Sequence, residues 1–308
     1  MSKGEVLITD SLFIFDEHVR EIEENGYSVV RLDKPKASEA ELCEAIRGKV
    51  GYILGGIEKV TDKVIRNADK LKVISFTGAG YTEFIPGFEA ARSRGIAITA
   101  AKGGNANAVA ELAITFALMG LRGVPRLTAV DGESFLTTKS ASESVIGVIG
   151  YGAIGQKVAQ KANEMGFSVL ISSRREPKRV PAPMRFVSLD SLLEESDVVS
   201  LHVDKLNGVN VLGPKEIAKL RSGAILVNVA FEEAVSQEAA IEAVKSKAIM
   251  YLADHPQPKL ASAPVGYSVC TNSQTAFNTF SALRKVSNQT TKSMLSVLQT
   301  GSDEFRVV

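Results

Sequence analysis

The sequence has few of the residues that build covalently linked or metal-held scaffolds, and it carries almost no net charge. Its 308 residues include two cysteines, Cys43 and Cys270, three histidines and no tryptophan. Two cysteines argue against a secreted disulfide framework, and histidines without a Cys/His cluster offer no material for a structural zinc site. The 36 Lys and Arg residues against 35 Asp and Glu residues give a net charge of +1. Such a chain has no strong field for a polyanion, which argues against general nucleic-acid binding.

The sequence also lacks long apolar runs. None approaches the roughly 20 residues that a membrane-spanning helix needs. The N-terminal segment MSKGEVLITD has no basic stretch followed by an apolar one, so no signal peptide is expected. With 45% hydrophobic and 23% charged residues, the composition is that of a globular chain long enough for about two domains. We therefore expect a cytoplasmic protein with no metal site that binds neither nucleic acid nor membrane.

Short segments rich in Val and Ile alternate with amphipathic segments along the chain. Five of them lie in the first hundred residues, and the later ones are expected as strands at 145–149, 167–172, 197–203, 224–230, 248–254 and 267–271. Alternation with short connections predicts parallel sheets covered by helices on both faces.

Three helices are indicated by local signals. Ser38 and Glu41 have the spacing of a capping box at the start of one. The nearly continuous apolar segment 105–120 predicts a helix buried between domains or between subunits. A long helix is expected over 274–299, ended by Gly301.

A glycine-rich motif follows the first strand of the later series. Gly150, Gly152 and Gly155 form GxGxxG after an apolar strand and at the start of a helix. Gly150 allows the tight turn, Gly152 lets the backbone approach a pyrophosphate, and Gly155 lets helix and strand pack closely. The free N–H groups of the helix N-terminus then hold the phosphates. The motif predicts a dinucleotide site that also includes Ala153 and Ile154.

The end of the next strand indicates which dinucleotide is bound. In NAD-binding domains a carboxylate about 20 residues after the glycines hydrogen-bonds the ribose hydroxyls. Here Ser172 and Ser173 replace that acid, and Arg174 and Arg175 follow. A carboxylate would repel a 2′-phosphate, whereas hydroxyls and guanidinium groups bind it. The sequence predicts NADP(H); the alternative is an ordinary solvated turn.

Several further segments resemble one family, the D-isomer-specific 2-hydroxyacid dehydrogenases. They are LKVISFTGAGYTEFIPGFEAARSRGIAIT, GGNANAVAELAITFALMGLRGVPR, SDVVSLHV, KLRSGAILVNVA and IMYLAD. The resemblance implies two Rossmann-like or flavodoxin-like α/β domains with an interdomain cleft, namely a discontinuous substrate domain (1–100 plus 285–308) and an NAD(P)-binding Rossmann domain (101–284). It also implies a homodimer and a small-molecule substrate. The implied substrate loop and further cofactor contacts are Gly78, Ala79, Gly80, His202, Val203, Val229 and Ala230.

The family's three catalytic positions are altered in this sequence. The arginine of its Asn-x-Ala-Arg-Gly stretch falls on Phe231, and the histidine of its Thr-Pro-His stretch falls on Ser273. Gln257 is the nearest match to the glutamate. Phe231 cannot pair with a carboxylate, and a serine and an amide cannot form an acid–base pair near neutral pH. A positioned general acid is worth roughly 10²–10⁴ in rate, so reduction of a typical 2-keto acid is not expected.

Other side chains are candidates for the missing roles. His255 is the best substitute acid because it lies close in sequence to the lost glutamate, and Tyr81 in the substrate loop could donate a hydrogen bond. Phe231 suggests an apolar or aromatic ligand. His18 is expected to be exposed on an N-terminal helix, and Cys270 is expected to be a buried strand thiol.

Three functions remain open. The first is an NADP(H)-dependent oxidoreductase with a non-standard active site that reduces a C=O or C=N acceptor other than a typical 2-keto acid. Protonation would come from His255, Tyr81 or water, or would be unneeded for a cationic iminium. The second is a non-catalytic NADP(H)-binding or regulatory protein whose closure on the cofactor is read by a partner. The third is an ordinary 2-keto acid reductase that uses unrecognised residues.

Overall fold

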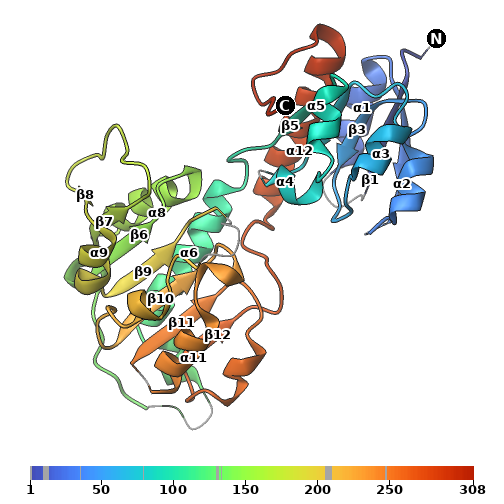
Figure 1. Cartoon of the computed structure of the whole chain (residues 1–308). Coiled ribbons are helices and arrows are strands. Elements are labelled where there is room, and N and C mark those ends of the chain that lie inside the picture. Colours follow the sequence, from blue (N-terminus) through green and yellow to red (C-terminus); the bar gives the residue numbers. More distant parts are fainter. Residues whose placement is uncertain are drawn as a thin grey trace. The chain divides into compact units, whose positions relative to one another are not determined.

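The chain forms two compact units, each built on its own sheet (Figure 1). Unit 1 consists of Met1–Asn105 and Thr279–Val308, and unit 2 of Ala106–Asn278. The computed structural model describes residues 2–9, 14–34, 36–78, 80–129, 132, 134–204, 210–246 and 248–308. Both sheets are parallel and carry helices on both faces, so the expected α/β fold class is confirmed. No helix of these described residues has the length and apolar character that a bilayer span requires.

Unit 1 has five parallel strands in the order β2-β1-β3-β4-β5. They are β1 Glu5–Thr9, β2 Ser28–Leu32, β3 Lys49–Leu54, β4 Val73–Phe76 and β5 Ala97–Ala100, and all five were predicted. Its helices are α1 Asp16–Glu24, α2 Glu39–Ala45, α3 Asp62–Asn67, α4 Tyr81–Phe84, α5 Phe88–Ser93 and α12 Phe280–Thr300. Residues of α1 and α12 share a core with one face of the sheet, and those of α2, α3 and α5 with the other. The predicted capping box at Ser38 and Glu41 is formed.

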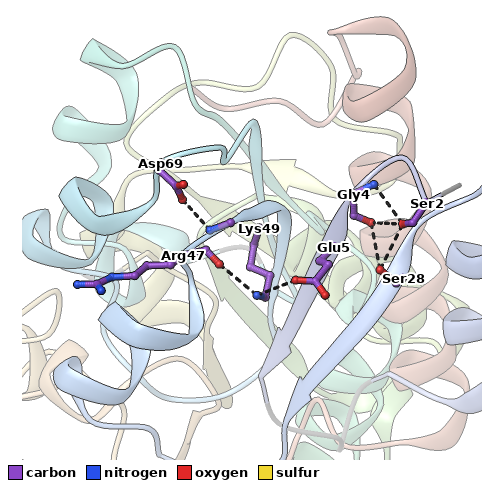
Figure 2. A network of polar contacts seen from close by, with 8 residues as sticks. Ser2, Gly4, Glu5, Ser28, Arg47, Lys49 and Asp69 are labelled. Atoms are coloured by element: carbon purple, nitrogen blue, oxygen red, sulfur yellow. Dashed lines mark hydrogen bonds and ion pairs between the residues drawn. The ribbon is translucent and has the colours of Figure 1, made fainter.

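A polar network ties together the amino ends of the first three strands of unit 1 (Figure 2). Lys49 donates from Nζ to Glu5 Oε2 and to the carbonyl of Arg47, at 3.1 Å each. The hydroxyls of Ser2 and Ser28 lie 3.3 Å apart. Ligands of such sheets bind at the carboxyl ends of the strands, so this network supports the opposite edge.

Two expectations for unit 1 are wrong. The last helix begins at Phe280 and not near residue 274, because Thr279 caps it by accepting from the N–H of Ala282 at 3.2 Å. His18 is buried, with 1% of its surface exposed, because it lies on the inner face of α1. Its Nδ1 accepts from the Phe15 N–H at 3.1 Å, and its Nε2 lies 2.8 Å from Asn288 Oδ1.

Unit 2 has a seven-stranded parallel sheet in the order β12-β11-β10-β9-β6-β7-β8. The strands are β6 Val145–Ile149, β7 Ser168–Ser172, β8 Arg185–Phe186, β9 Val198–Leu201, β10 Ala224–Asn228, β11 Ile249–Ala253 and β12 Ser268–Cys270. The helices are α6 Ala106–Leu121, α7 Val124–Thr128, α8 Ala153–Glu164, α9 Leu189–Glu195, α10 Pro214–Ile217 and α11 Gln237–Lys245, with short 3-10 turns η1 Ala141–Glu143, η2 Glu232–Ala234 and η3 Pro258–Ser262. Only the two-residue strand β8 was not predicted.

The apolar helix α6 is buried within unit 2. It packs against α8 and β10, and most of its side chains join the core on that face of the sheet. Gly120 permits close contact, because a Cβ there would lie 2.6 Å from a methyl carbon of Ile225. Much of the apolar character of this helix is therefore explained by packing inside unit 2.

Candidate functional site

The glycine-rich turn between β6 and α8 has the geometry that its sequence predicts. Gly150 has φ of +93°, and a Cβ there would lie 2.1 Å from the carbonyl oxygen of His202. A Cβ on Gly155 would lie 1.9 Å from the carbonyl oxygen of Gly150. Gly152 is the N-cap of α8 and has no atom within 4 Å of its would-be Cβ. The turn is therefore packed tightly from behind, while its front is open to a phosphate.

This turn forms one wall of a cavity of about 1360 Å³ in unit 2. The cavity brings together eight predicted cofactor residues: Gly150, Gly152, Ser172, Ser173, Arg174, Arg175, His202 and Val203. Five other predicted residues, Ala153, Ile154, Gly155, Val229 and Ala230, do not line it. Gly155 and Val229 are buried, which suits packing beneath the site.

Four basic side chains line the cavity at its β7 end. They are Arg174, Arg175, Lys178 and Arg179, all solvent-exposed. None makes a hydrogen bond or ion pair with any other described residue. Glu176 lies among them without forming an ion pair with a described residue. The sequence analysis missed Lys178 and Arg179, although the run RREPKR continues the basic character past Arg175.

His202 forms a neutral part of the cavity wall. It is half-buried, and burial lowers the pKa of its imidazole to about 3. Its Nε2 lies 2.9 Å from the Ser200 hydroxyl, and its Nδ1 has no partner among the described residues. An uncharged ring at neutral pH suits a wall residue rather than a proton donor.

Asn228 organises the carboxyl end of β10. Its Nδ2 donates to the Phe231 carbonyl at 3.0 Å and to the Tyr251 hydroxyl at 3.2 Å, and its Oδ1 accepts from the Ala230 N–H at 3.1 Å. The Tyr251 hydroxyl also lies 3.2 Å from His255 Nε2. An amide can serve a donor and an acceptor at once, which explains an asparagine at this turn.

Phe231 and Gln257, which the sequence analysis matched to the family's arginine and glutamate, lie on either side of Glu232 in the sequence. Phe231 is half-buried and packs against the core on the α11 face of the sheet. Gln257 is buried and donates from Nε2 to Glu232 Oε1 at 3.2 Å. The exposed carboxylate of Glu232 therefore has a fixed neutral partner. The sequence analysis did not predict this pairing.

Asp254 at the end of β11 holds the segment that contains Ser273. Its carboxylate accepts from the Thr271 hydroxyl at 3.1 Å and from the N–H groups of Thr275 and Ala276 at 3.0 and 2.8 Å. Ser273 itself is exposed, and its carbonyl accepts from the Thr271 hydroxyl. Asp254 thus has a positioning role, and Ser273 lies at the surface of unit 2.

His255 and Cys270 are both shielded from water, and burial shifts the pKa of each. His255 is buried, with 4% of its surface exposed, and burial lowers its pKa, although the nearby carboxylates of Glu232, Asp254 and Glu233 oppose that shift. Burial raises the pKa of the Cys270 thiol to about 11, so it is protonated at neutral pH and a poor nucleophile.

The predicted substrate-loop residues lie in unit 1. Tyr81 begins α4 and meets Phe88 edge to face, with ring centroids 6.4 Å apart. At Gly78 a Cβ would lie 2.8 Å from the Phe76 ring, whereas Gly80 has open space. Ala79 lies outside the described residues.

A family model and several known proteins are similar to this chain. A family model described as D-isomer specific 2-hydroxyacid dehydrogenase, NAD binding domain, matches residues 122–264. A hydroxypyruvate reductase of Thermotoga maritima is 32% identical over 67% of this chain and 68% of its own length. A D-3-phosphoglycerate dehydrogenase of Methanocaldococcus jannaschii is 30% identical over 78% of this chain but only 46% of its own length.

Solved structures resemble the whole chain. The TT0316 protein of Thermus thermophilus has a TM-score of 0.84 and 27% identity, covering 99% of this chain and all of that one. The NAD+-bound 3-phosphoglycerate dehydrogenase of Entamoeba histolytica has a TM-score of 0.82 over 100% of this chain and 99% of that one, at 22% identity, which shows the fold alone. The open front of the glycine turn and the cations beside it fit a nicotinamide dinucleotide.

Proposed function

The chain belongs to the D-isomer specific 2-hydroxyacid dehydrogenase family, and from this premise we propose that it is an NADP(H)-dependent oxidoreductase with a non-standard active site. Its acceptor is a C=O or C=N compound other than a typical 2-keto acid. The observation that carries the cofactor preference is the group of four cavity-lining cations without partners among the described residues: Arg174, Arg175, Lys178 and Arg179.

Each part of the cavity has a role in this proposal. Gly152, whose front is open, and the N–H groups at the start of α8 would hold the pyrophosphate. Ser173, Arg174 and Arg175 hold the 2′-phosphate through hydroxyl and guanidinium donors. The neutral His202 excludes water from the wall. The bound cofactor supplies or accepts a hydride at its nicotinamide ring.

The altered catalytic positions support the choice of acceptor. Phe231 has no charge with which to orient a substrate carboxylate, and Gln257 binds Glu232 instead of a histidine. A 2-keto acid would lose both its anchor and its proton donor here. An acceptor that needs neither is the chemistry these residues allow.

Cofactor preference is tested by binding. We expect Arg174→Ala to raise the Kd for NADPH by about 10- to 100-fold, since hydrogen bonds to charged groups are worth about 1.5–3 kcal/mol, and to leave the Kd for NADH unchanged. Arg221→Ala is the matched control, because Arg221 pairs with Asp197 outside the cavity. An unchanged ratio of the two affinities would refute the 2′-phosphate role.

A second candidate is a non-catalytic NADP(H)-binding or regulatory protein, favoured by the change at all three catalytic positions. The two are separated by mixing the protein and NADPH with glyoxylate, hydroxypyruvate, phenylpyruvate and a panel of imines, and following absorbance of the reduced nicotinamide. Turnover of the imines supports the oxidoreductase. Tight NADPH binding without turnover supports the second candidate, and fast turnover of the keto acids supports an ordinary reductase.

A cytoplasmic homodimer is part of the same proposal. Unit 2 exposes large apolar side chains on α7 and on two nearby segments, namely Val124, Leu127, Phe135 and Val265. Contiguous exposed apolar side chains are typical of protein–protein contacts. Light scattering that gives the mass of one 32.9 kDa chain would refute the dimer.

A further inference from the structure

The carboxyl ends of β10, β11 and β12 in unit 2 carry an uneven set of charges. Segments 228–236, 253–258 and 271–278 contain three acids, Glu232, Glu233 and Asp254, and no lysine or arginine. The family's arginine would place a cation here to hold an anionic substrate. In this chain these three segments have a net negative charge by sequence, and we call them the acidic edge.

Neutral donors hold two of these acids. Glu232 accepts from the amide of Gln257, and Asp254 accepts from a hydroxyl and from backbone N–H groups. Such contacts orient a carboxylate without cancelling its charge. The next cation along the chain, Lys259, forms no ion pair with Glu232 or Asp254 among the described residues. The charges of these two carboxylates are therefore open to a ligand.

The imidazole of His255 is a second, independent sign of a ligand. It is more than nine-tenths buried, its Nε2 faces the Tyr251 hydroxyl, and its Nδ1 has no partner among the described residues. Burial lowers the pKa of this imidazole, so it adds no positive charge at neutral pH. Phe231, the residue before Glu232, is half-buried, and aromatic rings attract cations through their faces.

From these observations we infer that the acidic edge selects a positively charged acceptor, an iminium ion, for reduction. The inference rests on the proposed function, because the reduced nicotinamide must supply the hydride. A C–H bond forms at the iminium carbon, and the C=N π pair moves to nitrogen. The positive charge on the substrate is lost while the nicotinamide regains its own. No proton is transferred, which accounts for a site without the family's general acid.

The negative field acts on the substrate before the reaction. Two unit charges a few ångströms apart near a protein surface attract by enough to change binding about tenfold or more. The same acids repel the carboxylate of a 2-keto acid. Glu232 is the specificity-determining residue, because it is exposed and its partner Gln257 is neutral.

The test uses the full chain and ligands with one bicyclic skeleton and different charge. The N-methylated dihydroisoquinolinium cation is the reducible acceptor, and beta-tetralone is the neutral ketone. The dimethylated tetrahydroisoquinolinium cation cannot be reduced, so calorimetry in the presence of NADP+ measures binding apart from activity. Phenylpyruvate, which has one ring and not the bicyclic skeleton, supplies the anionic case.

We expect reduction of the iminium with a kcat/KM well above that of the ketone and of phenylpyruvate. Glu232→Gln should weaken binding of the non-reducible cation about tenfold and leave the Kd for NADPH unchanged. Glu242→Gln, an exposed carboxylate of α11 outside the acidic edge, is the matched control and should change neither.

The outcomes separate this inference from the function on which it rests. Binding of NADPH with no preference for the cation, or with the preference intact in Glu232→Gln, overturns the inference and leaves the cofactor proposal standing. Failure to bind NADPH overturns the proposed function and the inference together. Loss of cation binding in both glutamate variants assigns the effect to overall charge and overturns the role of Glu232.

Discussion

Two regions along one edge of the unit 2 sheet differ in the sign of their charge. At the ends of β6, β7 and β9 lies the cavity, with four cations that have no partner among the described residues. At the ends of β10, β11 and β12 lies the acidic edge, with three acids and no lysine or arginine. Parallel strands place all these ends on one side of the sheet. The sheet itself therefore does not determine the sign of the charge in either region. The short loops after the strands determine it, separately for the cavity and for the acidic edge.

The two regions also differ in what holds them. In the cavity the backbone itself is packed, since Gly150 and Gly155 leave no room for a side chain. The acidic edge is held by side-chain hydrogen bonds around Asn228 and Asp254. Backbone packing allows few substitutions, whereas side-chain networks can be rebuilt one residue at a time.

The largest effect is expected from a change that closes the cavity without touching its packing. Gly152→Asp places a carboxylate where the pyrophosphate is proposed to bind, and we expect it to raise the Kd for NADPH at least 100-fold. Nothing lies within 4 Å of a Cβ there, and aspartate is a favourable N-cap, so the melting temperature should not fall. Titration with NADPH and thermal unfolding measure the two quantities. NADPH affinity within threefold of the parent would remove the pyrophosphate from this turn.

Histidines in the two regions predict how stability depends on pH. Burial lowers the pKa of His202 to about 3, below its unfolded value of 6.5. Below pH 6.5 the unfolded chain then binds a proton that the folded chain does not, so stability falls as pH falls. At pH 5 this one residue should cost about 2 kcal/mol relative to pH 7.

Chemical unfolding of the parent and of His202→Gln at both pH values isolates this contribution. The variant should lose about 2 kcal/mol less than the parent between pH 7 and pH 5. His255 shifts in the same direction for the same reason, although nearby acids oppose it. Equal losses in parent and variant would show that His202 is protonated in the folded chain.

Much of the fold could be predicted because its signals are local. Alternating apolar segments identified every strand but β8, whose two residues are too few for a pattern. The wrong predictions concern features that depend on contacts between residues far apart in the sequence. His18 was expected to be exposed because a lone histidine on a polar helix gives no local sign of burial, yet Asn288, far away in the sequence, binds it. The first turn of the last helix was predicted too early because Asp254 holds Thr275 and Ala276 in another conformation.

The cofactor cavity was easier to predict than the acidic edge. A glycine motif has fixed spacing, so Gly150, Gly152 and Arg174 could be located from the sequence. The pairing of Gln257 with Glu232 joins two loops whose approach depends on the register of β10 and β11. The number of residues between Glu232 and Gln257 in the sequence does not reveal that register.

Adding a positive charge to the acidic edge sharpens the comparison of the two regions. Phe231→Arg introduces a cation at the half-buried position that the sequence analysis matched to the family's arginine, next to Glu232 in the sequence. We expect binding of the non-reducible cation to weaken about tenfold. Phenylpyruvate turnover should rise only modestly, because the missing general acid still costs roughly 10²–10⁴ in rate. Calorimetry measures binding of the non-reducible cation, and steady-state rates measure turnover of phenylpyruvate. Unchanged cation binding would contradict the charge argument.

The smallest effect is expected at the outer end of the basic run. Lys178 and Arg179 are exposed, so water and salt screen their attraction for a phosphate, and each should contribute well under 1 kcal/mol. Lys178→Ala should therefore raise the Kd for NADPH about two- to threefold at low salt and leave it unchanged at high salt. Lys157→Ala is the control, because Lys157 is equally exposed on α8 but does not line the cavity. An equal loss in both variants would assign the effect to net charge, whereas a salt-independent tenfold loss in Lys178→Ala alone would show that this lysine contacts the phosphate directly.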